Sequence, residues 1–229
     1  MTTLALVTIG QAPPRRPHPG DRRRAPRSAR SGSTARSTTS TPTRSPRSRP
    51  GPGRGALTSR LRDGGSAVFG HDHSVPLLEK AVARAEADGA DLSLIVCTGL
   101  FPRIRHARPL FVAERLAHEG VRGLLNGLEG GRLGIVRPLP EQVDEAFDHW
   151  ESSIGVRPAA VGAASPYTDD HDTIAAAAAA VAVESDLVVL DCIGFDEDMR
   201  EAARSASADA GAAVVTVRSV AARLLGSLI

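Results

Sequence analysis

The stretch ESDLVVLDCIGFDED, Glu184 to Asp198, has a counterpart earlier in the chain, DGADLSLIVCTGLFP, Asp88 to Pro102. In both, an Asp precedes an apolar run, a Cys follows it, a Gly stands two residues beyond the Cys, and a Phe comes next or nearly next. Apolar runs rich in Val, Ile and Leu are typical of strands buried in a parallel sheet. We interpret the pair as a weak internal duplication, in which two similar halves each deliver a thiol to a strand end.

Outward from these two strands, the chain alternates between strand and helix patterns. Helices of 10 to 15 residues between apolar runs predict an α/β protein with parallel sheets. Ligands bind at the carboxyl edge of such sheets, where both thiols are expected. The further strands are predicted near 4–10, 131–138, 157–163 and 212–217, and the helices near 74–87, 142–150, 169–184 and from a cap at Ser219.

Length and composition restrict the class of protein. The 229 residues suffice for one large or two small domains, and with 3% aromatic residues the core must be built from Ala, Val, Leu and Ile. No run of 18 apolar residues predicts a membrane span, and MTTLALVTIGQ lacks the features of a signal peptide. Two cysteines are too few for a disulfide framework, so we expect a cytoplasmic protein with free thiols.

One segment carries the positive charge of the chain. Between Pro14 and Arg54 there are 12 Arg against one Asp, a local charge of +11, which leaves −9 for the remainder of a chain whose net charge is +2. The segment contains no Val, Ile, Leu, Met, Phe, Trp or Tyr. Without apolar surface to bury, it is predicted to be disordered.

The two thiols suggest a definite chemistry. A thiolate and a thiol on opposite sides of a carbon atom can move a proton from one face to the other, and one of them could instead act as a nucleophile. Either route is helped by a lowered thiol pKa. The competing interpretation is structural, because a buried Cys often behaves as a small hydrophobic residue. Equivalent placement in both halves makes Cys97 and Cys192 the candidate catalytic residues.

Four motifs together resemble the AroM family, a branch of the aspartate/glutamate racemase-like superfamily that includes hydantoin racemases and maleate isomerases. The resemblance covers 1–13 and 55–229. Its motifs are VTIGQAP at Val7 to Pro13, CTGLFP at Cys97 to Pro102, GRLGIVRPLPEQ at Gly131 to Gln142 and LDCIGF at Leu190 to Phe195.

This resemblance implies two pseudo-symmetric α/β lobes, an active site in the cleft between them and no cofactor. No metal site is predicted. It maps the superfamily's catalytic pair onto Cys97 and Cys192. The first lobe is expected at 1–13 and 55–130, and the second at 131–229. The residues implied to bind substrate are Thr8, Gly10, Gln11, Thr98, Gly99, Arg137, Pro138 and Gly194.

The sequence departs from the racemase pattern beside both thiols. Thr98-Gly99 stands where the pattern has Asn-Thr, and Ile193-Gly194 stands where it has Thr and His. Residues 14–54 depart further, since the family has a helix and a strand there. Arg, Pro, Ser, Thr, Gly and Ala are what GC-rich codons yield out of frame, so we hypothesise a shift of the coding frame between Pro13 and Gly55. The other reading frames of the nucleotide sequence would test this.

Other polar residues are candidates for metal or carboxylate binding. His71 and His73 could offer two metal ligands, but a solvated turn before a helix explains them better. The basic residues 103–108 could bind a carboxylate or form an ordinary loop. Arg137, at a strand end, is the preferred carboxylate partner, whereas Asp191 should face away from Cys192 and act structurally.

These observations predict a cofactor-independent racemase or isomerase that acts on a small carboxylate. A non-catalytic binding protein of the same fold is the alternative. Nucleic-acid binding by the Arg-rich segment is a weaker alternative, because the segment has no aromatic residues on which bases could stack. No membrane partner is expected, and the sequence leaves room for a homo-oligomer.

Overall fold

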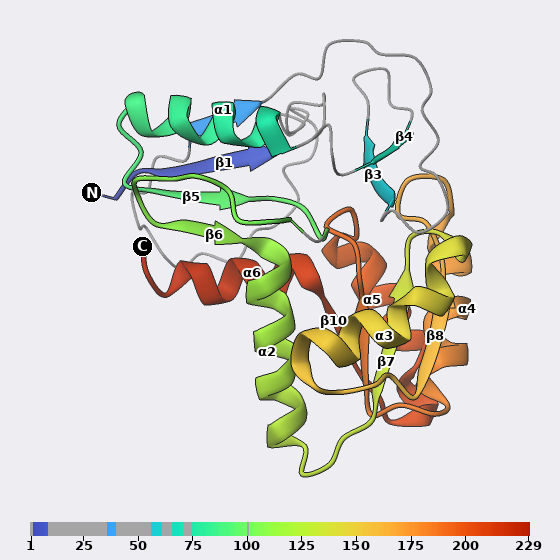
Figure 1. Cartoon of the computed structure of the whole chain (residues 1–229). Helices are drawn as coiled ribbons and strands as arrows, with labels where there is room; N and C mark the ends of the chain where they lie inside the picture. Colours follow the sequence, from blue (N-terminus) through green and yellow to red (C-terminus); the bar gives the residue numbers. More distant parts are fainter. Residues whose placement is uncertain (1, 9–35, 40–55, 61–65, 71–74, 100) are drawn as a thin grey trace, which may run out of the picture. The chain divides into compact units, whose positions relative to one another are not determined.

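The computed structural model describes residues 2–8, 36–39, 56–60, 66–70, 75–99 and 101–229 (Figure 1). The chain divides into two compact units, Met1–Phe111 with Ile229, and Val112–Leu228. We describe each unit by itself.

Unit 1 is built on a sheet with strand order β2-β1-β5-β6. Strand β1 pairs in parallel with β2 on one side and β5 on the other. Helix α1 packs on this sheet through Leu78 and Val82, and it ends before Gly89, whose φ of +89° suits glycine. The elements are β1 (Leu4–Thr8), β2 (Arg36–Thr39), an antiparallel hairpin of β3 (Ala56–Arg60) and β4 (Ser66–Gly70), α1 (Val75–Ala87), β5 (Leu92–Ile95) and β6 (Leu110–Val112).

Unit 2 contains a sheet with order β10-β9-β7-β8, in which the neighbouring strands are parallel. Its elements are α2 (Ala113–Gly127), β7 (Leu133–Arg137), a 3-10 turn (Pro140–Gln142), α3 (Val143–Ile154), β8 (Ala160–Ala163), α4 (His171–Ala182), β9 (Leu187–Leu190), α5 (Glu197–Ala206), a 3-10 turn (Ala208–Ala210), β10 (Ala213–Thr216) and α6 (Val217–Gly226).

The two sheets have the same topology. In each, the first strand of the sheet lies between the second and the third, and the fourth follows the third. Strand β1 therefore corresponds to β7, β2 to β8, β5 to β9 and β6 to β10. This confirms the predicted α/β class and the two pseudo-symmetric halves.

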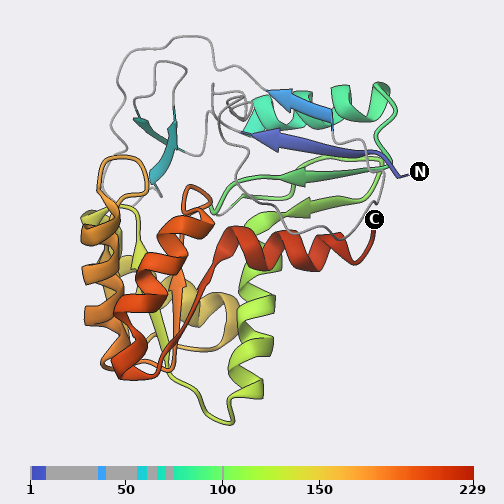
Figure 2. The ribbon, with the colours of Figure 1, turned by 180° about the vertical axis from the view of Figure 1, so that it is seen from behind.

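Helix α4 lies close against the sheet of unit 2. A Cβ on Gly134 would stand 2.4 Å from Val181 Cγ1, and a Cβ on Gly162 would stand 3.6 Å from the Ala177 carbonyl oxygen. The close approach was expected from the run of alanines, which gives the helix little thickness. Figure 2 shows α4 and α5 side by side, and the two helices are in contact.

Three features differ from the sequence expectations. Helix α6 begins earlier than predicted, because Thr216 is its cap: the Thr216 hydroxyl accepts from the Ser219 amide at 3.0 Å. The sequence patterns did not predict helices α2 and α5 or strands β3, β4 and β6. The buried face of α2 carries Glu114 and His118 among the apolar residues, which obscures the helical period.

The third difference concerns the Arg-rich segment. Four of its residues, Arg36–Thr39, form β2 beside β1, whereas the whole segment was predicted to be disordered. Strand pairing uses backbone hydrogen bonds and needs no apolar side chain, and β-branched Thr favours strands. Residues 14–35 and 40–54 lie outside the described residues.

The boundary between units also falls elsewhere than the predicted lobe boundary at 130/131. Helix α2 belongs to unit 2, because it packs on α6 and α3. Helices α2 and α6 approach so closely that a Cβ on Gly120 of α2 would stand 2.4 Å from Val220 Cγ1 of α6.

Candidate functional site

Cys192 lies two residues beyond the last residue of β9, in the core of unit 2. Val188, Leu190 and Cys192 alternate toward the core that α4 and α5 cover, as the period of a strand requires. The Cys192 side chain is buried, and its residue is 4% exposed. The Gly194 amide donates to Sγ at 3.4 Å, and the Tyr167 hydroxyl lies 3.7 Å from it.

Burial raises the pKa of Cys192 above its ordinary value. The hydrogen bonds from the Gly194 amide and from Tyr167 act in the opposite direction, because they stabilise the thiolate. Cys192 is therefore a neutral thiol near pH 7, with two groups placed to stabilise a thiolate when one forms. The lowered pKa expected for a reactive cysteine is not found for Cys192 in this conformation.

Cys97 occupies the equivalent position in unit 1. It lies two residues beyond the end of β5, as Cys192 lies two beyond the end of β9. The Val96 amide donates to the Val7 carbonyl, and in the same way the Asp191 amide donates to the Val136 carbonyl. Cys97 is buried, 6% exposed, and the two cysteines form no disulfide. Sequence and topology thus agree on the placement of the two thiols.

Asp191 points to the other face of the sheet, as expected from its place between two inward-facing residues. It is 1% exposed, and its Oδ2 accepts hydrogen bonds from Arg137 Nη1 at 2.5 Å and from Trp150 Nε1 at 2.9 Å. Burial by itself would raise the pKa of Asp191, but the positive charge of Arg137 and these hydrogen bonds hold it below its usual range. The buried pair is therefore ionised.

Arg137 was the preferred partner for a substrate carboxylate. In the structure one of its terminal nitrogens is bonded to Asp191, and its residue is 8% exposed. Its Nε has no hydrogen-bond partner among the described residues. Carboxylate binding by Arg137 remains a prediction, and Asp191 would compete for the same guanidinium.

The other candidate residues are placed as follows. Thr8 ends β1, Pro138 is buried directly after β7, and Gly99 is buried with Thr98 half-buried beside it. In the basic stretch, Arg105 pairs with Glu79, with 3.5 Å between Nε and Oε1. Gly10, Gln11 and the histidines at 71 and 73 lie outside the described residues.

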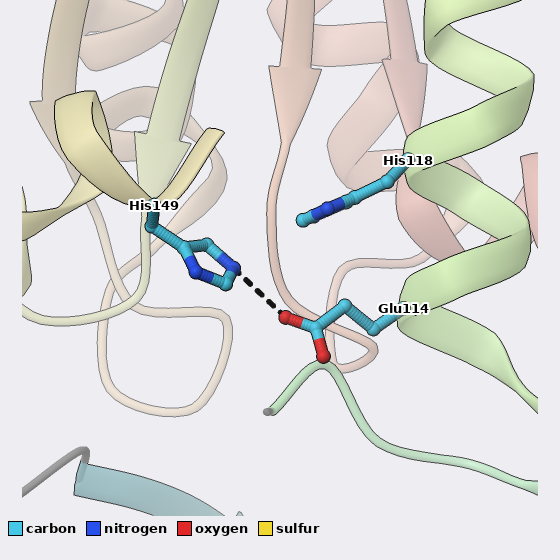
Figure 3. Close-up of side chains that lie close together, drawn as sticks. All are labelled: Glu114, His118 and His149. Carbon is cyan, nitrogen blue, oxygen red and sulfur yellow. Dashed lines mark hydrogen bonds and ion pairs between the residues drawn. The ribbon is translucent and has the colours of Figure 1, made fainter. Parts of the chain in front are cut away.

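A second polar cluster lies between α2 and α3. Figure 3 shows Glu114 and His118 projecting from α2 toward His149 of α3. His149 Nε2 and Glu114 Oε1 are 2.8 Å apart, and His118 Nδ1 is 2.6 Å from Ser153 Oγ. The His118 ring packs on Trp150, with 3.9 Å between ring centroids.

Burial lowers the pKa of His118, against the attraction of Asp191 and Glu114, so this ring is neutral near pH 7. The sequence signal for this cluster is the pair Glu114 and His118, four residues apart. Because no helix was predicted there, the two could not be placed on one face.

A family model described as AroM protein matches residues 4–229. The chain belongs to the AroM family. The resemblance of its four motifs to that family is therefore confirmed. No curated protein sequence matches this AroM chain.

Solved structures resemble the AroM chain in fold. An unliganded arylmalonate decarboxylase is 15% identical with a TM-score of 0.64, and the match covers 100% of this chain and 92% of the other. A variant of the maleate cis-trans isomerase of Nocardia farcinica with a covalently bound succinylcysteine intermediate is 13% identical with a TM-score of 0.58, over 99% and 92%. The allantoin racemase of Klebsiella pneumoniae is 14% identical with a TM-score of 0.54, over 100% and 87%.

These similarities establish a racemase-like fold. None of the helices in the described part of the AroM chain is both long enough and apolar enough to cross a membrane.

Proposed function

We propose that this AroM protein is a cofactor-independent racemase or isomerase that acts on a small carboxylate through Cys97 and Cys192. One observation carries the proposal: each thiol stands two residues beyond the third strand of a sheet, and the two sheets have the same strand order. A residue placed only to fill space has no reason to recur at the same point in both halves.

The raised pKa of Cys192 suggests which cysteine donates the proton and which one removes it. Cys192 begins as a thiol, so it is the proton donor, and Cys97 begins as the base. The Cys97 thiolate removes a proton from the substrate carbon, and Cys192 delivers its own proton to the opposite face. At the end Cys97 is a thiol and Cys192 a thiolate, and the reverse reaction exchanges the roles.

The groups around Cys192 are suited to this order of proton transfers. The thiolate left after proton delivery receives hydrogen bonds from the Gly194 amide and from Tyr167. A Cβ on Gly194 would stand 2.7 Å from the Tyr167 hydroxyl, so glycine is needed for Tyr167 to reach the thiol. Substrate contacts are assigned to Thr8, Gly10, Gln11, Thr98, Gly99, Arg137, Pro138 and Gly194.

The proposed substrate class is supported by proteins of known structure that have a similar fold. The similar structures include an allantoin racemase, and a maleate isomerase that carries a succinylcysteine intermediate. The second of these shows a cysteine of that protein bonded to a four-carbon dicarboxylate skeleton. We therefore expect a small carboxylate for this chain, held with its reacting carbon between the thiols.

The test is hydrogen exchange at carbon in D₂O, followed by NMR over a panel of small carboxylates that includes aspartate, glutamate and maleate, with the hydantoin derivative allantoin as a ligand that has no carboxylate. Cys97→Ser and Cys192→Ser should each reduce exchange by about 10²-fold or more, since each removes one acid–base group. His171→Ala, an exposed change at the start of α4, serves as the control and should leave the rate unchanged. Unchanged turnover of an accepted substrate in both serine variants would refute the mechanism.

A non-catalytic binding protein is the second candidate, favoured by the burial of Cys192 and its raised pKa. It predicts ligand binding without exchange in D₂O. Calorimetry with the same panel separates the two, because a binder retains its affinity in both serine variants and exchanges no substrate proton.

A further inference from the structure

The cluster of Glu114, His118 and His149 has no part in the two-thiol reaction. Residues four apart on a helix lie one above the other on the same face, so α2 presents Glu114 and His118 as a pair. The third residue comes from α3. One donor atom from each of the three lies within 4.8 Å of the other two. All three residues belong to unit 2.

His118 provides the observation that points to a ligand. The residue is 2% exposed, and its Nδ1 is hydrogen-bonded to Ser153 Oγ. When Nδ1 donates its proton to that hydroxyl, Nε2 carries the lone pair. The Nε2 atom is buried and has no hydrogen-bond partner within the described ranges of the chain. A buried acceptor left in this state is destabilising, and a bound ion would remove that penalty.

We propose that Glu114, His118 and His149 bind a divalent cation of the zinc class, which links α2 to α3. Two imidazole nitrogens and one carboxylate oxygen are a donor set suited to Zn²⁺ or Co²⁺, whereas Mg²⁺ and Ca²⁺ prefer oxygen alone. The fourth position of a tetrahedral ion is left for water or another small ligand.

The arrangement around the donors supports this assignment. Histidines that bind metals almost always donate their other ring N–H to a nearby acceptor, which fixes the ring. Ser153 is placed to do this for His118. The ion takes the place of the proton between His149 Nε2 and Glu114 Oε1, which are now 2.8 Å apart. Since donors around Zn²⁺ stand about 2.0–2.1 Å from the ion, small side-chain rotations suffice.

Charge is also compatible with a cation. Glu114 contributes one negative charge, and neutral imidazoles contribute none. Arg137, a cation that acts on His118, is paired with Asp191. A divalent ion therefore leaves one positive charge, which an anion in the fourth position would balance. His149, whose side chain is 15% exposed, is the most accessible of the three.

The experiment uses the full-length protein after treatment with a chelator. Zn²⁺ is titrated by calorimetry, and Co²⁺ by its visible absorption, which reports tetrahedral coordination. We expect one ion per chain and a rise in Tm when Zn²⁺ is added. Glu114→Gln and His149→Ala should weaken binding by more than 10²-fold, and Ser153→Ala by about 10-fold to 100-fold, the usual effect of a residue that orients a ligand.

Two controls separate this site from other donors. His71→Ala with His73→Ala removes the histidine pair that the sequence suggested, and Cys97→Ser with Cys192→Ser removes both thiols; each should bind Zn²⁺ as the parent does. Binding lost with the thiols, or with His71 and His73, would overturn the proposal. So would binding retained in Glu114→Gln, whose size matches the parent and whose unfolding curve without metal should match as well. The result is independent of turnover by the thiols.

Discussion

At the scale of single residues, the side chains that follow β9 face alternately to its two sides, and each side has its own chemistry. Cys192 faces the core under α4 and α5, where burial keeps it protonated. Asp191 faces α3, where Arg137 keeps it ionised. One residue step along the strand thus separates a neutral acid from a fixed negative charge.

Tyr167 is expected to stabilise the thiolate form of Cys192. Tyr167→Phe removes the hydroxyl 3.7 Å from Sγ and should raise the pKa of Cys192 further. The measurement is the rate of alkylation by iodoacetamide against pH in the Cys97→Ser background. The profile should move to higher pH in Tyr167→Phe. An unchanged profile would mean that the hydroxyl does not act on the thiol.

Asp191→Asn should destabilise the protein by about 3–5 kcal/mol, because it leaves the Arg137 charge buried without its partner. The pKa of Asp191 is depressed in the folded state, whereas an unfolded Asp has a pKa of about 3.9. The stabilisation is therefore fully present above about pH 4 and is lost as the pH falls through the folded pKa. Urea unfolding at a series of pH values measures it, with the exposed change Asp209→Asn as the control.

At the scale of elements, sequence patterns identified six strands and four helices but not helices α2 and α5 or strands β2, β3, β4 and β6. The apolar runs of β5, β7, β9 and β10 are strong signals, and Asp170 caps α4 as the acidic start of that helix suggested. Helix α2 buries a carboxylate and an imidazole instead of apolar side chains alone. Their partners lie about 35 residues away on α3, so no local pattern could account for them.

The contact of α4 with its sheet depends on glycine in the strand. Gly134→Ala should cost about 1–3 kcal/mol, because the new Cβ would stand 2.4 Å from both Val181 Cγ1 and Ser185 Oγ. Gly123→Ala is the matched control in the same unit. It lies inside α2 with nothing within 4 Å of its Cβ, and it should stabilise by about 0.5–1 kcal/mol. Thermal unfolding compares the two variants, and equal Tm values would argue against the close packing.

At the scale of the whole molecule, two units with the same strand order each supply one thiol. The proposed proton transfer requires both thiols to face one carbon atom. Cross-linking of the two thiols tests this requirement.

Dibromobimane, which bridges only thiols that approach each other closely, provides that test. We expect one bridged product joining the peptides that contain Cys97 and Cys192, identified by mass spectrometry after digestion. Each single Cys→Ser variant should give none. Separate modification of each thiol without bridging would contradict the two-thiol mechanism, because the groups could not then share a substrate.

Local patterns along the chain were enough to predict the α/β class, the duplication and the equivalent positions of the two cysteines, because strand periodicity and strand-end chemistry involve neighbouring residues alone. The folded chain was needed to learn that Arg137 is bonded to Asp191, that Cys192 is a neutral thiol, and that Glu114, His118 and His149 come together. Those facts depend on burial and on contacts between residues far apart in the chain. Burial and long-range contacts cannot be predicted from the spacing of residues along the chain.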